Sequence, residues 1–438
     1  MRLLFFTLIS VIGYIVLGYF TSRESTTVLF LLYLSLFATF IAAWHTAEEF
    51  NVKKYLFIAI GLRLLFMFSM PFLSDDVYRF IWDGRLLING ISPFAALPID
   101  YITNQSAIPG IDDSLYKLLN SPEYFTVYPP LSQFVFWLSA LISPQNTFGS
   151  ILVIRILIIL AEVGSLMLMV KLLKHYKLPA KNILLYALNP LIILELTSSL
   201  HFEAFVIYFL LLGLYLLHKH KVVFSGISWS IAIGFKLIPL IFLPLLIRRI
   251  SIKKQAVLYL TIGVLTILLF IPLYDGALIN GLSSSLTLYF QTFEFNASIY
   301  YLARAAGYWF TGYNIIAQLG PSLAVTTLIV ILFYSLFSKQ KMKFLPEAMM
   351  FVLLIYLSFA TTVHPWYITT LIALSVFSTY RFSILWSLLI FVTYSGYSST
   401  GYIEPIYLIT FEYIALASFL AYEIYSHSRK FRSPNIAQ

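Results

Sequence analysis

The sequence contains no cysteine, and charged residues are scarce, since Asp, Glu, Lys and Arg make up 11% of its 438 residues. Without cysteine the chain can form no disulfide, no thiolate metal site and no thiol nucleophile. A soluble protein of this length carries about 25% charged residues. The shortage of charge therefore excludes an ordinary soluble domain.

Hydrophobic residues make up 60% of the chain and aromatic residues 18%. Apolar runs recur along its length, for example at 3–20, 27–44, 256–274 and 347–363. Runs of this kind have the length that a helix needs to cross ~30 Å of hydrocarbon. The first run lacks a small-x-small cleavage site, which favours a retained helix over a signal peptide. The sequence predicts an all-α polytopic membrane protein with one integral-membrane domain, residues 1–438.

The distribution of positive charge predicts the topology. If the N-terminus is cytoplasmic, 20 of the 28 Lys and Arg residues fall on the same side of the membrane, as do both termini. The predicted segments are three N-terminal helices in 1–72, an external loop with interfacial helices in 73–149, further helices in 150–274, a second external loop in 275–320 and C-terminal helices in 321–438.

Residues 222–247 have basic clusters at both ends, although 26 residues are too few for two full crossings. A hairpin of half-helices that turns near 234–239 fits this pattern, and a single long tilted helix is the alternative. Lys236 lies in the middle of the segment. A lysine deep in an apolar run indicates a functional site, unless its side chain snorkels to the interface. A phosphate would be a natural counter-ion for it.

Under this topology the unusual polar and aromatic residues collect on the external side, between apolar helices. They are Asp75, Asp76, Arg79, Asp83 and Tyr128 in the first loop, His201 and Glu203 in the 198–203 turn, Asn296 and Arg304 in the second loop, and His364, Trp366 and Tyr367 in the 363–367 turn. A lipid-linked substrate would present its polar head at that depth.

The two aspartates have a structural interpretation and a functional one. In a helix that starts at Ser74, both lie in the first turn, where the helix dipole favours carboxylates, and Asp75 could pair with Arg79. Adjacent acids repel each other, however, and neighbours on a helix point about 100° apart and so serve different partners. In the functional interpretation, one of them accepts a proton from the substrate.

Other charged residues in apolar runs are expected to have structural roles. Arg63 and Arg155 are predicted to snorkel, and Glu162, on the same helix face as Arg155, is predicted to pair within the bundle. The histidines and aspartates could in principle bind a divalent metal, but no tight ligand spacing is present, so no metal or other cofactor is expected.

The motifs resemble those of the GT-C superfamily of integral-membrane glycosyltransferases, and in particular its bacterial mannosyltransferase-like members with an Asp-x-Tyr-Arg-Tyr-x-Trp-Asp-Gly signature. Phe80 and Phe94 replace common tyrosines, and Ser92 replaces a common asparagine. The motifs, in the expected order, are DVYRFIWDG at 76–84, NGISPF at 89–94, YPPL at 128–131, GFKLIP at 234–239, FNAS at 295–298 and HPWY at 364–367.

The resemblance implies a GT-C-type bundle of roughly 12–14 transmembrane helices or half-helices with a large first external loop. It implies transfer of a sugar, mannose, from a polyprenyl-phosphate donor with inversion, on the periplasmic face of a bacterial inner (plasma) membrane. The acceptor would be a glycolipid, a polysaccharide or a protein. The sequence has no Gly-rich nucleotide-binding turn, and no nucleic-acid partner is expected.

The resemblance also implies roles for individual residues. Asp76 aligns with the leading aspartate of the signature and is the expected general base, with Asp75 as the alternative. The donor phosphate would be held by Lys236, His364, His201 and Arg304. The substrate cleft would be lined by Arg79, Asp83, Tyr128, Glu203, Asn296, Trp366 and Tyr367, with Asp83 pairing with Arg79 or Arg85 to hold the loop in shape. Elementary chemistry agrees, because the reaction needs a carboxylate at the acceptor and positive charge where phosphate departs.

Two other function classes share some of these features. A half-helix hairpin with a buried lysine also occurs in transporters and lipid flippases. The absence of an internal repeat and the gathering of polar residues at one face favour the enzyme. A non-catalytic subunit that binds lipid-linked glycans is the third reading, and it predicts that the aspartates can be replaced without loss of function.

Overall fold

A computed structural model of the chain describes residues 2–105, 107–399 and 401–432, and most of these residues are helical. One short antiparallel pair of strands is present, β1 (Tyr397–Ser398) with β2 (Gly401–Tyr402). This composition confirms the predicted all-α class.

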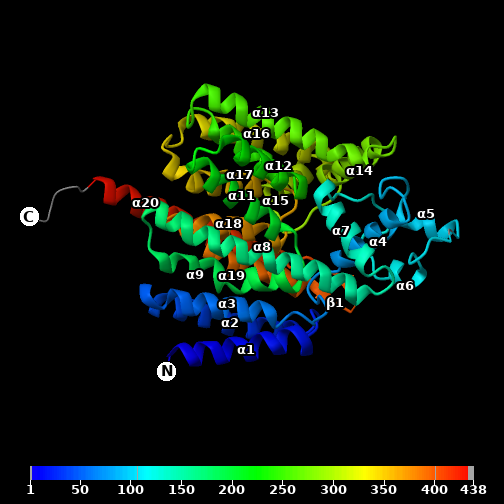
Figure 1. The fold of residues 1–438 in the computed structure, drawn as a ribbon, viewed down its shortest axis with the longest axis horizontal. Coiled ribbons are helices and arrows are strands. Elements are labelled where there is room, and N and C mark those ends of the chain that lie inside the picture. The colour runs from blue at the N-terminus through cyan, green and yellow to red at the C-terminus, as the bar shows by residue number, and fades with distance from the viewer. Residues whose placement is uncertain (1, 106, 400, 433–438) are drawn as a thin grey trace, which may run out of the picture.

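The first half of the chain includes helices α4 to α7, which gather at one end of the bundle (Figure 1). Its helices are α1 (Arg2–Phe20), α2 (Thr26–Thr46), η1 (Glu49–Asn51), α3 (Val52–Leu64), α4 (Asp76–Ile88), α5 (Pro98–Thr103), α6 (Asp113–Tyr116), α7 (Pro130–Ile142), α8 (Thr147–Tyr176), η2 (Ala180–Ile183), α9 (Leu184–Ala187), α10 (Pro190–Ile192), the π-helix η3 (Ile193–Ser198) and α11 (Glu203–His218).

The second half supplies the rest of the bundle. Its helices are α12 (Val222–Phe235), η4 (Ile238–Leu246), α13 (Ile252–Phe270), η5 (Ile271–Leu273), α14 (Leu278–Gln291), α15 (Ile299–Thr311), α16 (Ile316–Phe337), η6 (Met342–Phe344), α17 (Leu345–Phe359), η7 (Pro365–Tyr367), α18 (Ile368–Ser375), α19 (Phe382–Leu389), η8 (Ile390–Gly396) and α20 (Ile406–Arg432).

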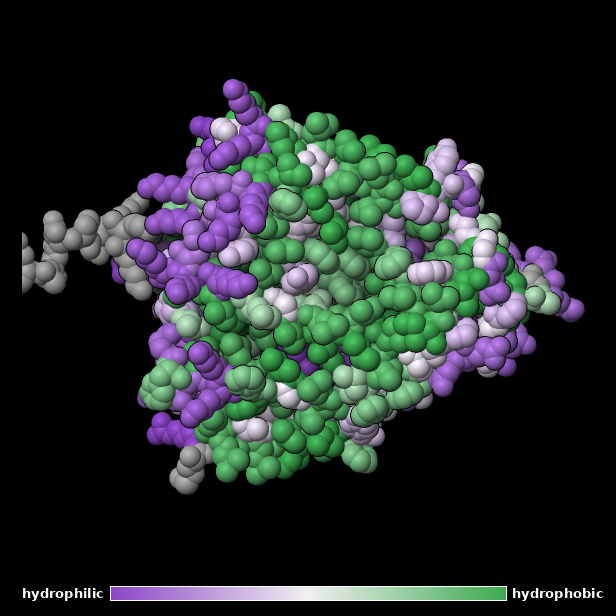
Figure 2. Space-filling model, viewed as in Figure 1, coloured by the Kyte–Doolittle hydropathy of each residue, from purple (hydrophilic) through white to green (hydrophobic). Residues whose placement is uncertain are grey.

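Among the described residues, seven helices are long and apolar enough to cross a membrane, and a bent pair over 180–198 adds an eighth. Four shorter apolar helices, of 10–17 residues, accompany them. Exposed large side chains such as Leu4, Leu260 and Phe333 cover α1, α13 and α16. Figure 2 shows the resulting apolar belt between two hydrophilic ends. The protein is therefore a polytopic membrane protein, as the composition predicts.

The long helices lie side by side along the length of the molecule (Figure 1). Helices α4 to α7 gather at one end, and the start of α1 and the end of α20 lie toward the opposite end (Figure 1). The basic loops meet away from α4–α7, for example where Arg249 donates to the Lys339 carbonyl at 2.7 Å. The chain thus separates a basic end from the end that carries the first large loop.

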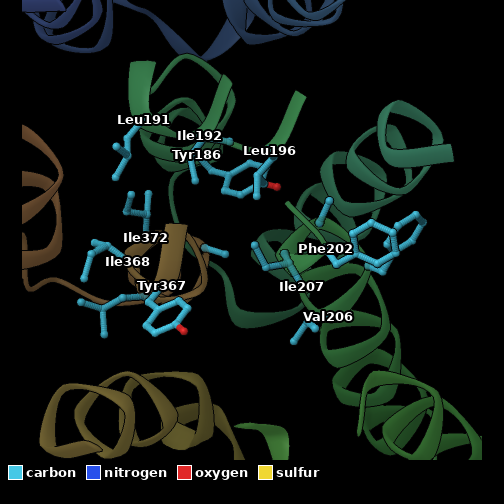
Figure 3. Packing of buried hydrophobic residues seen from close by; sticks show 14 of the residues in the cluster. Tyr186, Leu191, Ile192, Leu196, Phe202, Val206, Ile207, Tyr367, Ile368 and Ile372 are labelled. Atoms are coloured by element: carbon cyan, nitrogen blue, oxygen red, sulfur yellow. The ribbon is translucent and has the colours of Figure 1, made fainter. Parts of the chain in front are cut away.

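Two irregular segments interrupt the helices in the middle of the chain. The π-helix η3 ends in a turn whose Leu200 has φ +65°, a conformation that L-residues rarely adopt. The second break follows α12, where Lys236 is extended (φ −157°, ψ 139°) before η4 begins. Both breaks lie beside a common apolar core, in which Leu196, Phe202 and Tyr367 pack from separate segments (Figure 3). Breaks of this kind free backbone groups and turn side chains towards a shared site.

Candidate active site

Four segments that are distant in sequence meet at the α4 end of the bundle. Asp76 begins α4, His201 lies in the turn before α11, Lys236 follows α12, and Trp366 lies in η7. His201 Nδ1 lies 4.0 Å from Asp76 Oδ2, and its ring stacks on that of Trp366 with centroids 3.8 Å apart. Lys236 pairs with Glu203, two residues after His201. The structure therefore joins five of the residues selected from the sequence in one polar cluster.

Asp76 is held by neutral hydrogen-bond donors. Asn120 Nδ2 donates to Asp76 Oδ1 at 2.7 Å, and the Tyr128 hydroxyl donates to Oδ2 at 3.4 Å. Burial raises the pKa of the Asp76 carboxyl, while the Asn120 hydrogen bond and the positive charge of Lys236 act in the opposite direction. The side chain keeps 18% of its exposure. A partly buried carboxylate with a raised pKa and an open side is suited to accept a proton.

Asp75 faces another partner. Its Oδ2 lies 2.6 Å from Arg23 in the α1–α2 connection, and the guanidinium of Arg23 also lies over the ring of Tyr397, 4.7 Å from the centroid. The predicted pair of Asp75 with Arg79 is therefore replaced by a pair with Arg23. The α1–α2 connection is far away in sequence, so helical spacing could not have suggested it.

Arg79 and Asp83 form an internal pair of the first loop. Arg79 Nε donates to Asp83 Oδ1 at 2.8 Å, and Gln133 Nε2 donates to Asp83 Oδ2 at 2.9 Å. Arg79 also donates to the carbonyls of Ser121 and Tyr124. Both charged side chains are buried, at 4% and 0% exposure. The structure thus places them where they hold α4, α7 and the 121–124 segment together, as expected for the Asp83–Arg79 pair.

Lys236 brings the positive charge of the cluster. Its Nζ forms a short contact with the Glu203 carboxylate and lies 4.2 Å from the centroid of the Tyr367 ring. The side chain remains 26% exposed, so an anion could reach it. Glu203 is the first residue of α11, which fixes the carboxylate beside the break after α12.

Two histidines sandwich Trp366. Its ring stacks on His201 and also on His364, with centroids 4.3 Å apart and planes 6° apart. Burial, and then the charge of Lys236, lower the pKa of His364 to about 3, and the same causes hold the pKa of His201 well below its usual range. Both imidazoles are therefore neutral at physiological pH. They can donate or accept hydrogen bonds but add no positive charge.

Asn296 and Arg304 lie in the neighbouring loop. Asn296 is fully buried, and its backbone N–H donates to Glu404 at 2.6 Å. The next residue back, Phe295, pairs with the 361–363 segment and packs on His364 with ring centroids 4.6 Å apart. Arg304 pairs with Glu294 at 2.5 Å. This loop supports His364, while the contacts that the structure gives Arg304 are with the loop itself.

Sequence reasoning missed the part played by Arg155. Its guanidinium is fully buried and donates to backbone carbonyls on two separate segments. These are Met67 (3.2 Å) and Ser69 (2.7 Å) before α4, and Thr197 (3.0 Å) and Ser198 (3.1 Å) before His201. The expected snorkelling does not occur. Arg155 instead ties together the two segments that present Asp76 and His201.

Arg63 also differs from expectation, whereas Glu162 pairs within the bundle as predicted. Arg63 Nε donates to Glu162 Oε1 at 2.9 Å, and both side chains are fully buried. Glu162 of α8 therefore pairs with α3, and Arg63 does not snorkel to the interface. An isolated buried charge is costly, so the presence of both acidic and basic residues in the apolar runs could have indicated a buried ion pair.

Glu195 is a further buried acid that the motifs did not mark. It lies in η3, and the Tyr394 hydroxyl donates to its Oε1 at 2.6 Å. Its Oε2 lies 3.4 Å from His201 Nε2. Among the residues that the structure describes, no group of three or more His, Asp or Glu side chains is spaced to hold a metal ion.

Residues 8–251, more than half of the chain, match the MptA_B family, described as alpha-(1->6)-mannopyranosyltransferase, N-terminal domain. The matched region contains Asp76, His201 and Lys236, whereas Trp366 lies beyond it. No curated protein matches the chain. The chain belongs to the MptA_B family and is an integral-membrane mannosyltransferase.

Proposed function

We propose that this mannosyltransferase takes mannose from a polyprenyl-phosphate donor and transfers it, with inversion, to an acceptor hydroxyl at the external face. The observation that carries the proposal is that one cluster contains both a proton acceptor and a positive charge. Asp76 supplies a carboxylate with a raised pKa, and Lys236, close enough to act on that pKa, supplies an ammonium group. These are the two groups that the displacement of a phosphate by an alcohol requires.

The reaction is a single displacement. Asp76 accepts the proton of the acceptor hydroxyl as that oxygen forms a bond to C1 of the mannose. The bond between C1 and the phosphate oxygen breaks on the opposite face, and its electron pair leaves with the polyprenyl phosphate. Tyr128 and Asn120 hold the Asp76 carboxylate in place during the transfer.

Lys236 stabilises the departing phosphate. The phosphate monoester that departs carries more negative charge than the Glu203 carboxylate and forms strong charge-assisted hydrogen bonds, so it can compete for the Lys236 ammonium. The neutral ring of His364 flanks this position, where its N–H can donate to a phosphate oxygen.

An apolar cavity of about 220 Å³ lies between η4, α16 and α17. Its lining includes Leu240, Ala324, Ile331 and Thr361. Leu240 is four residues after Lys236, and Thr361 is three residues before His364. A phosphate at Lys236 would therefore leave the attached isoprenoid chain beside an apolar chamber, which supports a lipid-linked donor.

The placement of the reaction on the external face rests on the bias of positive charge. The basic loops occur at the end away from α4–α7, and cytoplasmic loops are the ones enriched in Lys and Arg. The cluster at Asp76 then opens on the other side, which in a bacterial inner membrane is the periplasm.

The test is label transfer in membranes that contain the protein. Radiolabelled mannose is supplied either as polyprenyl-phosphate mannose or as a nucleotide-linked mannose, to wild type and to Asp76→Asn. We expect transfer from the lipid donor alone, and a loss of about 100-fold or more in Asp76→Asn, as for removal of a general base. Transfer from the nucleotide sugar alone would refute the donor, and equal transfer by the variant would refute the base.

The face of the membrane needs its own measurement. Right-side-out and inverted vesicles are given a water-soluble, membrane-impermeant acceptor glycan together with the lipid donor. Labelling of the glycan in right-side-out vesicles supports the external site, whereas labelling confined to inverted vesicles contradicts it.

A further inference from the structure

The displacement described above does not use Glu195, although this acid touches the cluster. Its Oε2 and the Nε2 of His201 lie 3.4 Å apart, and neither atom has a hydrogen-bond partner elsewhere in the described part of the chain. The backbone N–H of His201 also donates to the Glu195 carbonyl, at 3.2 Å. The wide turn of η3 thus brings the acid directly against the ring.

The other ring nitrogen of His201 faces Asp76. Its Nδ1 lies 4.0 Å from Asp76 Oδ2, so the imidazole stands between two carboxyl groups. The stack on Trp366, with planes 17° apart, fixes the orientation of the ring. A movement of about 1 Å would bring Nδ1 and Oδ2 within hydrogen-bond distance.

The positions of the protons follow from the surroundings. Glu195 is fully buried, and its side-chain neighbours are the Tyr394 hydroxyl and the His201 ring, both uncharged. An ionised carboxylate without a cation is costly at such a position, whereas a protonated carboxyl can donate to Nε2. The other charged groups around the ring are Asp76, Glu203 and Lys236, and the charge of Lys236 disfavours an imidazolium.

We infer that Glu195 is a positioning residue that fixes the tautomer of His201. The protonated carboxyl donates to Nε2, the ring therefore carries its proton on Nδ1, and this N–H points at Asp76 Oδ2. His201 then orients the Asp76 carboxylate toward the acceptor hydroxyl, while Tyr394 holds Glu195 in place. The inference rests on the proposed function in one respect, namely that Asp76 is the base.

The test measures the tautomer of the His201 ring directly. The ¹³C and ¹⁵N chemical shifts of His201 are measured in purified wild type, Glu195→Gln and Glu195→Met, and His201→Asn identifies the signals. We expect the Nδ1–H tautomer in wild type and in Glu195→Gln, because the amide N–H of Gln can replace the carboxyl proton. Glu195→Met lacks a donor and should give a mixture of tautomers.

Mannosyl transfer is measured on the same proteins. We expect Glu195→Gln to stay within about threefold of wild type, and Glu195→Met to lose about 100-fold in kcat with an unchanged KM for the donor, as for a misaligned base. Equal losses in both variants would show that an ionised acid is needed and would overturn the inference.

The two readouts separate this inference from the proposed function. An Nε2–H tautomer or an imidazolium in wild type, or an unchanged tautomer in Glu195→Met, refutes the role of Glu195 whatever the activity. Absence of transfer by wild type, with the expected tautomers, refutes the proposed function instead. If Glu195→Met does not fold, wild type and Glu195→Gln still decide the question.

Discussion

The adjacent carboxylates of Asp75 and Asp76 face different partners. Asp75 lies 2.6 Å from Arg23, and Asp76 accepts hydrogen bonds from Asn120 and Tyr128 and faces His201. One of the two acids therefore belongs to an ion pair between loops, and the other belongs to the polar cluster.

Asp75→Asn is expected to retain most of the mannosyltransferase activity. The Asp75–Arg23 pair is partly exposed, and such pairs contribute about 0–1 kcal/mol to stability. Label transfer and thermal unfolding of Asp75→Asn are compared with those of Asp76→Asn. A loss of activity in Asp75→Asn as large as that in Asp76→Asn would contradict the assignment of the base.

The acidic limb of the pH profile reports on Asp76. Because burial raises the pKa of this carboxyl, kcat/KM should fall at a pH above the usual Asp range of about 3.9. A base works when ionised, so activity is present above the raised pKa and is lost as the pH falls through it.

Two variants should shift this limb in opposite directions. Glu203→Gln removes a negative charge that raises the Asp76 pKa, so the limb moves to lower pH. Asn120→Ala removes a hydrogen bond that lowers it, so the limb moves to higher pH. Shifts of the same sign in both variants would show that another group controls the profile.

Lys236→Met should lower kcat by about 100-fold or more, since it removes the charge that stabilises the departing phosphate. Lys221→Met is the matched control, because Lys221 is exposed at the other end of α12. Steady-state transfer rates with the lipid donor measure both variants. A similar loss in the control would indicate a general effect on α12.

The apolar cavity can be tested by filling it. Ala324→Phe should raise the KM for the polyprenyl donor about tenfold, because displacing about two buried CH₂ groups costs ~1.4 kcal/mol or somewhat more. Val325→Phe is the control, since Val325 is the next residue on α16 and is 58% exposed. Donors with shortened isoprenoid chains should be affected less by Ala324→Phe. Equal KM values in the two variants would show that the isoprenoid chain binds outside this cavity.

Arg155→Met should destabilise the protein by about 3 kcal/mol or more, because four backbone carbonyls lose their buried donor. Arg155→Lys should restore only part of the stability, since an ammonium cannot reproduce the guanidinium fork. Ile156→Met, at an exposed neighbour, is the control. Thermal unfolding in detergent measures all three, and wild-type stability in Arg155→Met would contradict this role.

Much of the candidate site was accessible from the sequence. Seven residues were selected because polar groups between apolar helices need partners, and the structure brings these seven together. They are Asp76, Tyr128, His201, Glu203, Lys236, Trp366 and Tyr367. Asn296 and Arg304 were selected on the same grounds, but the structure pairs Asn296 with Glu404 and Arg304 with Glu294. A polar residue between apolar runs shows that a partner is needed, but the sequence does not show which residue that partner is.

The sequence by itself determined that this protein is an all-α membrane protein, because the length and apolarity of its runs leave few other ways to satisfy the backbone. It also determined that polar side chains gather between those runs. Only the tertiary structure decided that Glu195 faces His201, that Arg23 pairs with Asp75, and that Arg155 joins the segments before α4 and α11. These contacts span about 40 to 90 residues or pass through an irregular π-turn, so they depend on how the helices pack and not on any local period.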